Sequence, residues 1–161
     1  MTDTSEEKTV QDQLQGRFPY LAQHIRVARQ RRIFADVPAA NLAEVFDCAV
    51  RQMGFSMLCT ITGLDLAESL GVIYHLARTS GVVLSLSTSV DRQAPVIESV
   101  TQYFPAADAY EREMVDLLGF EVRGLAPGQR YPLPDSWPKG QFPLRKDWQP
   151  SMLEKDEGKN A

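Results

Sequence analysis

Few residues of this 161-residue chain have the types and spacing that catalysis requires. His24 and His75 are its two histidines, and His75 lies within an alternating apolar pattern that is typical of a hydrogen-bonded sheet residue rather than a base or a metal ligand. Ten residues separate Cys48 from Cys59, so they form no Cys-x-x-Cys pair. An iron–sulfur cluster generally takes four cysteines, and two reduced, mostly buried thiols are the better interpretation.

Sequence motifs for nucleotide, phosphate or metal chemistry are absent. The chain contains no Gly-x-Gly-x-x-Gly, no phosphate loop, no His-Glu-x-x-His and no nucleophile elbow. Glu111 and Glu113 are two positions apart on an expected helix, where they do not share a face as an acid/base pair. We therefore expect no catalytic residue, no metal ligand and no cofactor in this chain.

A dense group of charges lies on a helix that the pattern predicts over residues 106–118. Its apolar side chains fall on one face at about 100° per residue, and this face should pack on a sheet. They are Ala107, Tyr110, Met114, Leu117 and Leu118. Arg112, Glu113 and Asp116 fall on the opposite face, with Glu111 on the flank, and the four-residue spacing allows Arg112 and Asp116 to pair. Gly119 suits a left-handed C-terminal cap.

Two interpretations of this charged face stay open. A solvated face is the commonest use of such a pattern. Alternatively, the charges pair with a partner protein, where they would set register and choice of partner.

The segment 124–150 carries six prolines, which excludes a helix or a central strand. It also contains Tyr131, Trp137, Phe142 and Trp148, so it is not a plain linker. Aromatic side chains and arginine are common anchors at interfaces, and proline reduces the entropy lost on binding. One alternative is an arm folded back on its own core. We expect at least its end to reach onto a partner, through Leu144, Arg145, Lys146, Asp147 and Trp148.

The elements that must position these residues follow from periodicity. Two strands are predicted within 24–37, a helix after Pro38, and three further strands near 55–62, 71–78 and 82–90, the last two as a hairpin. A short helix or turn is expected after Pro95. This order predicts an α+β fold of two layers, with helices on one face of a mixed or antiparallel sheet and an extended Pro-rich C-terminal arm. The expected boundaries are a disordered tail 1–13, a core 14–123, the arm 124–150 and a disordered tail 151–161.

The amino-acid composition limits the classes of protein to which this chain can belong. Apolar residues make up 43% and charged residues 24%, as in ordinary globular domains. The net charge of −4 disfavours nucleic acid as a partner. The basic cluster at 26–32 is interpreted as a solvated turn in preference to an RNA contact, with anionic lipid headgroups as a minor alternative. No apolar run approaches the roughly 20 residues of a membrane span, and the acidic N-terminal residues lack an export signal.

The run Glu-Arg-Glu-x-x-Asp-Leu-Leu-Gly-Phe at 111–120 resembles the signature of the 30-kilodalton subunit family of respiratory complex I, whose members are also called the C subunits of NADH-quinone oxidoreductase. The arm Leu-Pro-Asp-Ser-Trp-Pro-Lys-Gly-Gln-Phe-Pro-Leu-Arg-Lys-Asp-Trp at 133–148 is similar to the branch found in energy-converting, membrane-bound nickel-iron hydrogenases. Complex I members more often have a Gly-His-Pro-type segment after the helix, whereas residues 124–128 here contain no histidine.

This resemblance implies a non-catalytic structural subunit that docks onto a large catalytic subunit of a hydrogenase, beside iron–sulfur subunits. It favours an interface role for Glu111, Arg112, Glu113 and Asp116. The nickel-iron centre and the iron–sulfur clusters would belong to partner subunits, and the chain would lie on the cytoplasmic side of the cell membrane, peripherally. The alternative is the same role in a proton-pumping NADH-quinone oxidoreductase. A free-standing adaptor and a small enzyme are the remaining alternatives.

Overall fold

The computed structural model describes residues 3–153 of the chain. Its main sheet has five strands in the order β1-β2-β5-β4-β3. These are β1 (Ile25–Arg29), β2 (Arg32–Asp36), β3 (Met57–Asp65), β4 (Ser69–Ala77) and β5 (Val83–Asp91). Neighbours are antiparallel except β2 and β5, which run parallel, so the sheet is mixed as the sequence predicts.

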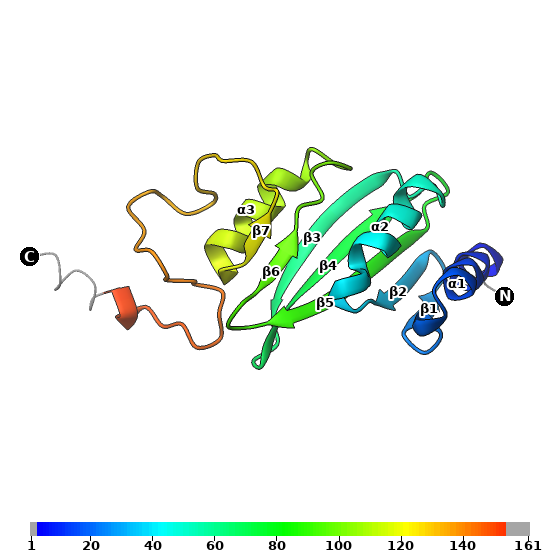
Figure 1. Cartoon of the computed structure of the whole chain (residues 1–161), viewed down its shortest axis with the longest axis horizontal. Coiled ribbons are helices and arrows are strands. Elements are labelled where there is room, and N and C mark those ends of the chain that lie inside the picture. Colours follow the sequence, from blue (N-terminus) through cyan, green and yellow to red (C-terminus); the bar gives the residue numbers. More distant parts are fainter. Residues whose placement is uncertain (1–2, 154–161) are drawn as a thin grey trace, which may run out of the picture.

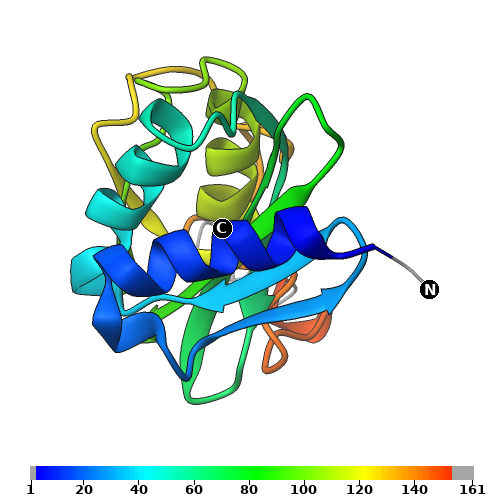
Figure 2. The same cartoon turned by 90° about the vertical axis from the view of Figure 1, so that its right-hand side faces the viewer.

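The helices α1 (Ser5–Arg17), α2 (Leu42–Arg51) and α3 (Ala107–Leu118) gather on one side of this sheet, as Figure 2 shows. Two short 3-10 helices, η1 (Pro19–Leu21) and η2 (Ala39–Asn41), precede β1 and α2. The helices lie on this side because the buried apolar side chains of the strands point toward it. Phe46 of α2, for example, meets the ring of Tyr74 on β4 edge to face, with centroids 5.3 Å apart. The predicted two-layer α+β fold is confirmed.

A second, two-stranded parallel sheet links β6 (Val96–Glu98) to β7 (Glu121–Arg123) on either side of α3. The sequence predicted a short helix or turn after Pro95, and this prediction is wrong because pairing with β7 stabilises an extended conformation. That partner strand is more than 20 residues away in the sequence, so local periodicity does not reveal it.

The expected disorder of residues 1–13 is also wrong from Ser5 onward, where α1 begins. The sequence of α1 is mostly polar, but a narrow stripe of its residues is buried. Val10 and Leu14 are fully buried against the core, and the carboxylate of the buried Glu7 accepts a hydrogen bond from the backbone N–H of Arg31. Of the expected C-terminal tail, residues 151–153 form one helical turn, and 154–161 lie outside the described residues.

Residues 124–150 contain no helix or strand. They lie beyond α3, at the opposite end of the molecule from α1 (Figure 1). We call this segment the arm. All residues of the buried apolar core precede residue 121, so the arm is an addition to a core that is complete without it.

Candidate docking site

Helix α3 is the element on which the arm is built. Its apolar side packs on the sheet, with Met114 and Leu118 buried, and it ends at Gly119, whose φ of +76° is readily adopted only by glycine. Glycine has a second function here, because a Cβ at position 119 would lie 2.6 Å from the ring of Phe142 in the arm. The end of α3 is therefore shaped to receive the arm.

Glu111 lies on the buried side of α3. Its side chain is fully buried, and it accepts hydrogen bonds from the Val100 backbone N–H (2.7 Å) and the Ser99 hydroxyl (2.8 Å). Burial raises the pKa of the Glu111 carboxyl, although these two hydrogen bonds oppose the shift. Glu111 was predicted to contact a partner, but its side chain has no exposed surface in this chain, where it anchors the segment that leads into α3.

Arg112 and Asp116 do not pair with each other. Arg112 binds Asp108, one turn earlier, at 2.8 and 2.9 Å, and donates to the backbone carbonyls of Ala126 (2.8 Å) and Gln129 (3.4 Å) in the arm. The Arg112 side chain thus faces the arm rather than solvent.

Asp116 is 7% exposed and accepts hydrogen bonds from Arg130 (3.1 Å) and from the backbone N–H of Leu133 (3.3 Å). Its carboxylate therefore fixes the middle of the arm. Arg112 and Asp116, two residues of the predicted charged face of α3, therefore support the arm.

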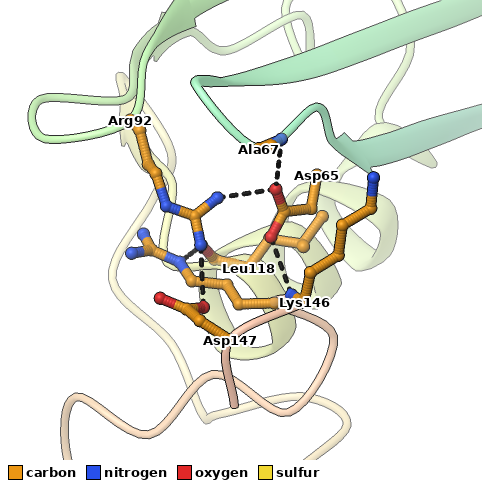
Figure 3. A network of polar contacts seen from close by, with 7 residues as sticks. Asp65, Ala67, Arg92, Leu118, Lys146 and Asp147 are labelled. Carbon is orange, nitrogen blue, oxygen red and sulfur yellow. Dashed lines mark hydrogen bonds and ion pairs between the residues drawn. The ribbon is translucent and has the colours of Figure 1, made fainter.

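The end of the arm is held by a network centred on Asp65, the last residue of β3 (Figure 3). Asp65 accepts hydrogen bonds from Arg92 (2.6 Å), from the backbone N–H of Ala67 (2.8 Å) and from the backbone N–H of Lys146 (2.8 Å). Arg92 also binds Asp147 at 2.7 Å. The hydrogen bond from Arg92 is the main reason that the pKa of Asp65 is lowered to about 2.

The rest of the arm packs against itself and the end of α3. Arg145 lies over the Phe142 ring, 4.6 Å from its centroid, and donates to the Leu118 carbonyl at 2.7 Å. Trp148 donates to the side-chain oxygen of Gln141 at 2.9 Å, and its ring lies 6.0 Å from that of Trp137. The last part of the arm is therefore a small ordered unit.

Several of the predicted interface residues remain exposed, among them Glu113 and Leu144. Glu113 is exposed, and within residues 3–153 it has no ion-pair partner. Leu144 is 57% exposed, and only its backbone is tied down, through the Leu117 carbonyl. Both line a hollow of about 250 Å³ between α3 and β3. Sequence reasoning missed Asp65, Arg92 and Arg130, because no local pattern connects positions so far apart in the chain.

His75 is held within the sheet between the hydroxyls of Thr62 (3.2 Å) and Ser85 (2.9 Å), so its interpretation as a hydrogen-bonded sheet residue is confirmed. Burial lowers its pKa. Between residues 3 and 153, no three His, Cys, Asp or Glu side chains are grouped to hold a metal ion, and no helix there is long and apolar enough to cross a bilayer.

Similar proteins come from several respiratory complexes. The C subunit of F(420)H(2) dehydrogenase from Methanosarcina mazei is 32% identical over 145 residues, which cover 88% of this chain and 91% of that protein. The C/D subunit of NADH-quinone oxidoreductase from Phocaeicola vulgatus is 33% identical over 121 residues, covering 73% of this chain but 23% of that protein. The beta subunit of the membrane-bound hydrogenase from Pyrococcus furiosus is 30% identical over 87 residues, covering 52% of this chain and 50% of that protein.

The fold is also found in a solved structure. A chain of the membrane-bound sulfane sulfur reductase, an archaeal respiratory membrane complex, superposes with a TM-score of 0.78 at 23% identity, covering 96% of this chain and 92% of that chain. Residues 35–152 match the family described as respiratory-chain NADH dehydrogenase, 30 Kd subunit. This match spans most of the core and the whole arm, and it agrees with the resemblance carried by residues 111–120. The chain belongs to the 30 Kd subunit family of the respiratory-chain NADH dehydrogenase.

Proposed function

We propose that this chain is a non-catalytic docking and assembly subunit in the peripheral electron-transfer part of a membrane-bound, energy-converting oxidoreductase, where it binds the large catalytic subunit. The match to the C/D protein carries the proposal, since this chain corresponds to 23% of a polypeptide whose name combines two subunits. A domain that is covalently joined to a neighbour in one relative is expected to hold that neighbour through surface contacts where it is a separate chain.

The arm supports this proposal. Its hydrogen bonds to α3 and Asp65 order a surface that the apolar core does not need for its own burial. Ordering a binding surface before the partner arrives reduces the entropy lost on association. Arg145, Asp147, Trp148 and the backbone of Lys146 would then act mainly by holding the arm in shape. The exposed side chains of Glu113, Leu144 and Lys146 remain free to make contacts.

Within this class, we favour the nickel-iron hydrogenase branch, on the arm sequence at 133–148 and the absence of a histidine at 124–128. The hydrogenase beta subunit among the relatives agrees with this choice. The nickel-iron centre and the iron–sulfur clusters would lie on sister subunits, and those subunits would hold this chain on the cytoplasmic side of the membrane. The alternative is the corresponding small subunit of a proton-pumping NADH-quinone oxidoreductase. The similarity to the C/D subunit of such an enzyme supports this alternative.

The test is affinity purification of the tagged full-length chain from its native membranes after gentle solubilisation, with mass spectrometry and metal analysis of the product. Nickel, together with a large subunit that carries two Cys-x-x-Cys pairs, is the expected result. Iron without nickel, beside flavin or quinone subunits, would favour the NADH-quinone oxidoreductase alternative.

A tagged chain that ends at Phe142 is the matched control, because it keeps the whole apolar core but loses Leu144 and the contacts of Lys146 and Asp147 with Asp65 and Arg92. We expect it to recover less of the complex. Recovery of the full-length chain alone, with no subunits, would contradict the proposal and favour an independent adaptor or a small enzyme.

A further inference from the structure

We infer that the outer edge of β3 and the adjoining side of α3 form a groove that takes an extended segment of the large subunit as an added strand. This inference rests on the proposed function for the identity of the partner. It starts from a difference between the two edges of the main sheet, which end in β1 and β3.

The β1 edge is protected in the ways that natural sheets use against unwanted pairing. It has five residues, its register is interrupted between Val27 and Arg29, and it carries Arg26 as a further charge. Helix α1 also covers it, with the Gln11 side chain donating to the Ile25 carbonyl at 3.1 Å.

The β3 edge shares one of these features, a register shift between Leu58 and Thr60, but it has neither the short length nor the arginines of β1. It has nine residues, and the sequence 56–64 contains neither a charge nor a proline. Met57 is 59% exposed, and the Cys59 side chain is exposed as well. Within residues 3–153, β3 pairs with β4 alone. Helix α3 packs beside it, with the Met114 and Leu118 side chains against Gly63 and the Tyr110 hydroxyl 3.4 Å from the Cys59 carbonyl. A long, uncharged, open edge is a template for pairing with another chain.

Helix α3 provides a wall beside this edge. The hollow of about 250 Å³ lies between residues 61–63 of β3 and one side of α3, and Leu144 of the arm also lines it. From α3 it is lined by Tyr110, Glu113, Met114, Leu117 and Leu118. Extended peptides that add to a sheet edge gain affinity from main-chain hydrogen bonds and specificity from pockets for alternate side chains. The hollow can serve as such a pocket.

The chemistry of the groove defines the segment that it fits. Leu144 and Met57 offer apolar surface, and Glu113 offers a carboxylate without an ion-pair partner among the described residues. The matching segment is extended, with an apolar side chain for the hollow and a lysine or arginine opposite Glu113. A second copy of this chain fits less well, because residues 56–64 carry no cation for Glu113 of the other copy.

The chain carries its own probe of this edge. Its two cysteines are the exposed Cys59 on β3 and the buried Cys48 on α2. N-ethylmaleimide labelling, measured by mass spectrometry of the peptides of this chain, is compared between the free chain and the purified complex. We expect the labelling of Cys59 to slow by at least about tenfold in the complex, because added strand pairing limits access to the edge. Cys48 should stay unlabelled in both, which controls for unfolding.

Variants test the same edge by assembly. Glu113→Lys and Met57→Lys should each reduce the amount of large subunit recovered by about tenfold. The first places a lysine opposite the cation expected in the partner segment, and the second places a lysine on the sheet edge. Glu68→Lys and Leu66→Lys are matched controls on exposed positions in the turn between β3 and β4, and we expect them to leave recovery unchanged.

The outcomes separate the two proposals. If the chain is recovered in the complex but Cys59 reacts as fast as in the free chain, the groove is not the docking site and the proposed function stands. Crosslinking of Cys59 to Cys59 of another copy would also overturn the inference, in favour of a homodimer. If no complex is recovered with the full-length chain, the proposed function fails and the inference fails with it.

Discussion

Single carboxylates determine how α3 is used, and Glu111 is the most deeply buried of them. A buried carboxylate is costly unless it is hydrogen-bonded, and Glu111 meets this condition with the N–H of Val100 and the hydroxyl of Ser99. These contacts connect α3 to the segment that follows β6. The residue that looked most like part of a docking surface therefore acts inside the chain.

Glu111→Ala should lower the free energy of unfolding by about 2–4 kcal/mol, because it leaves the buried Val100 N–H without an acceptor and opens a cavity. Glu111→Gln keeps the shape and an acceptor, so we expect a smaller loss. Urea unfolding followed by circular dichroism measures both. The matched control is Glu113→Ala, two residues away on the surface, which should change stability by no more than about 0.5 kcal/mol. Equal effects of the two alanine substitutions would contradict the buried role of Glu111.

Arg112 is the second residue whose function depends on its geometry. Its guanidinium binds Asp108 and two arm carbonyls at once, and it lies so close to Gly128 that a Cβ there would be 2.6 Å away. Arg112→Lys keeps the charge but cannot make all these contacts, because an ammonium lacks the planar fork. We expect proteolytic cleavage within 126–130 to become about tenfold faster, corresponding to roughly 1.4 kcal/mol, while β4 stays uncleaved. Unchanged cleavage at 126–130 would show that the arm does not depend on this guanidinium.

At the residue scale, the sequence predicted which side of α3 is buried, but not what its charged side chains contact. The apolar side of α3 was correctly predicted, because helical periodicity alone determines it. Arg112 and Asp116 do not form the pair that their spacing allows, since the arm supplies a competing cation, Arg130, for Asp116. Glu111 was placed on the flank because a helical projection contains no information about Ser99 and Val100.

At the scale of elements, the arm is attached through one acid at the end of β3. Asp65 binds Arg92 from the end of β5 and the backbone of Lys146 from the arm, so it joins two strands and the arm. Its side chain is 3% exposed, and its pKa is lowered from 3.8 to about 2. A carboxyl whose pKa is lowered in the folded state stabilises that state above its unfolded pKa, and the stabilisation is lost as the pH falls through the folded value.

The end of the arm should therefore detach as the pH falls from about 4 to 2. Both tryptophans of the chain, Trp137 and Trp148, lie in the arm, so tryptophan fluorescence follows the arm alone while far-ultraviolet circular dichroism follows the core. We expect the fluorescence to change between these pH values, and Asp65→Asn to show the detached fluorescence already at neutral pH. Asp135→Asn, at an exposed position of the same arm, is the control. An Asp65→Asn variant that titrates like the unmodified chain would exclude Asp65 as the anchor.

The elements predicted from sequence were those whose signal is local. The two strands within 24–37, the helix after Pro38 and the hairpin of β4 and β5 all follow from periodicity and short turns, and the structure contains them. Helix α1 and strand β6 were missed because distant partners stabilise them: Glu7 binds the turn at Arg31, and β6 pairs with β7. The parallel pairing of β2 with β5 likewise depends on a crossover that no local pattern specifies.

At the scale of the whole molecule, a complete core and an ordered arm occupy opposite ends, with α1 closing one edge of the sheet and α3 standing beside the other (Figure 1). The arm buries few apolar side chains of its own, so its order depends on hydrogen bonds and ion pairs. Such contacts contribute modestly to stability when they face water, but they fix geometry. This division predicts that the arm can be shortened without unfolding the chain.

A chain that ends at Phe142 tests this division directly. It keeps the Phe142 ring against Gly119 and the contacts of Asp116, but it loses the contacts of Arg145, Lys146 and Asp147. We expect cooperative urea unfolding with a loss of about 1–3 kcal/mol, because a few hydrogen bonds are removed and no buried core residue is. Circular dichroism and the recovery of the large subunit are measured on the same variant. A folded core with reduced recovery would mean that the arm serves docking, whereas loss of the cooperative transition would mean that it is part of the folding unit.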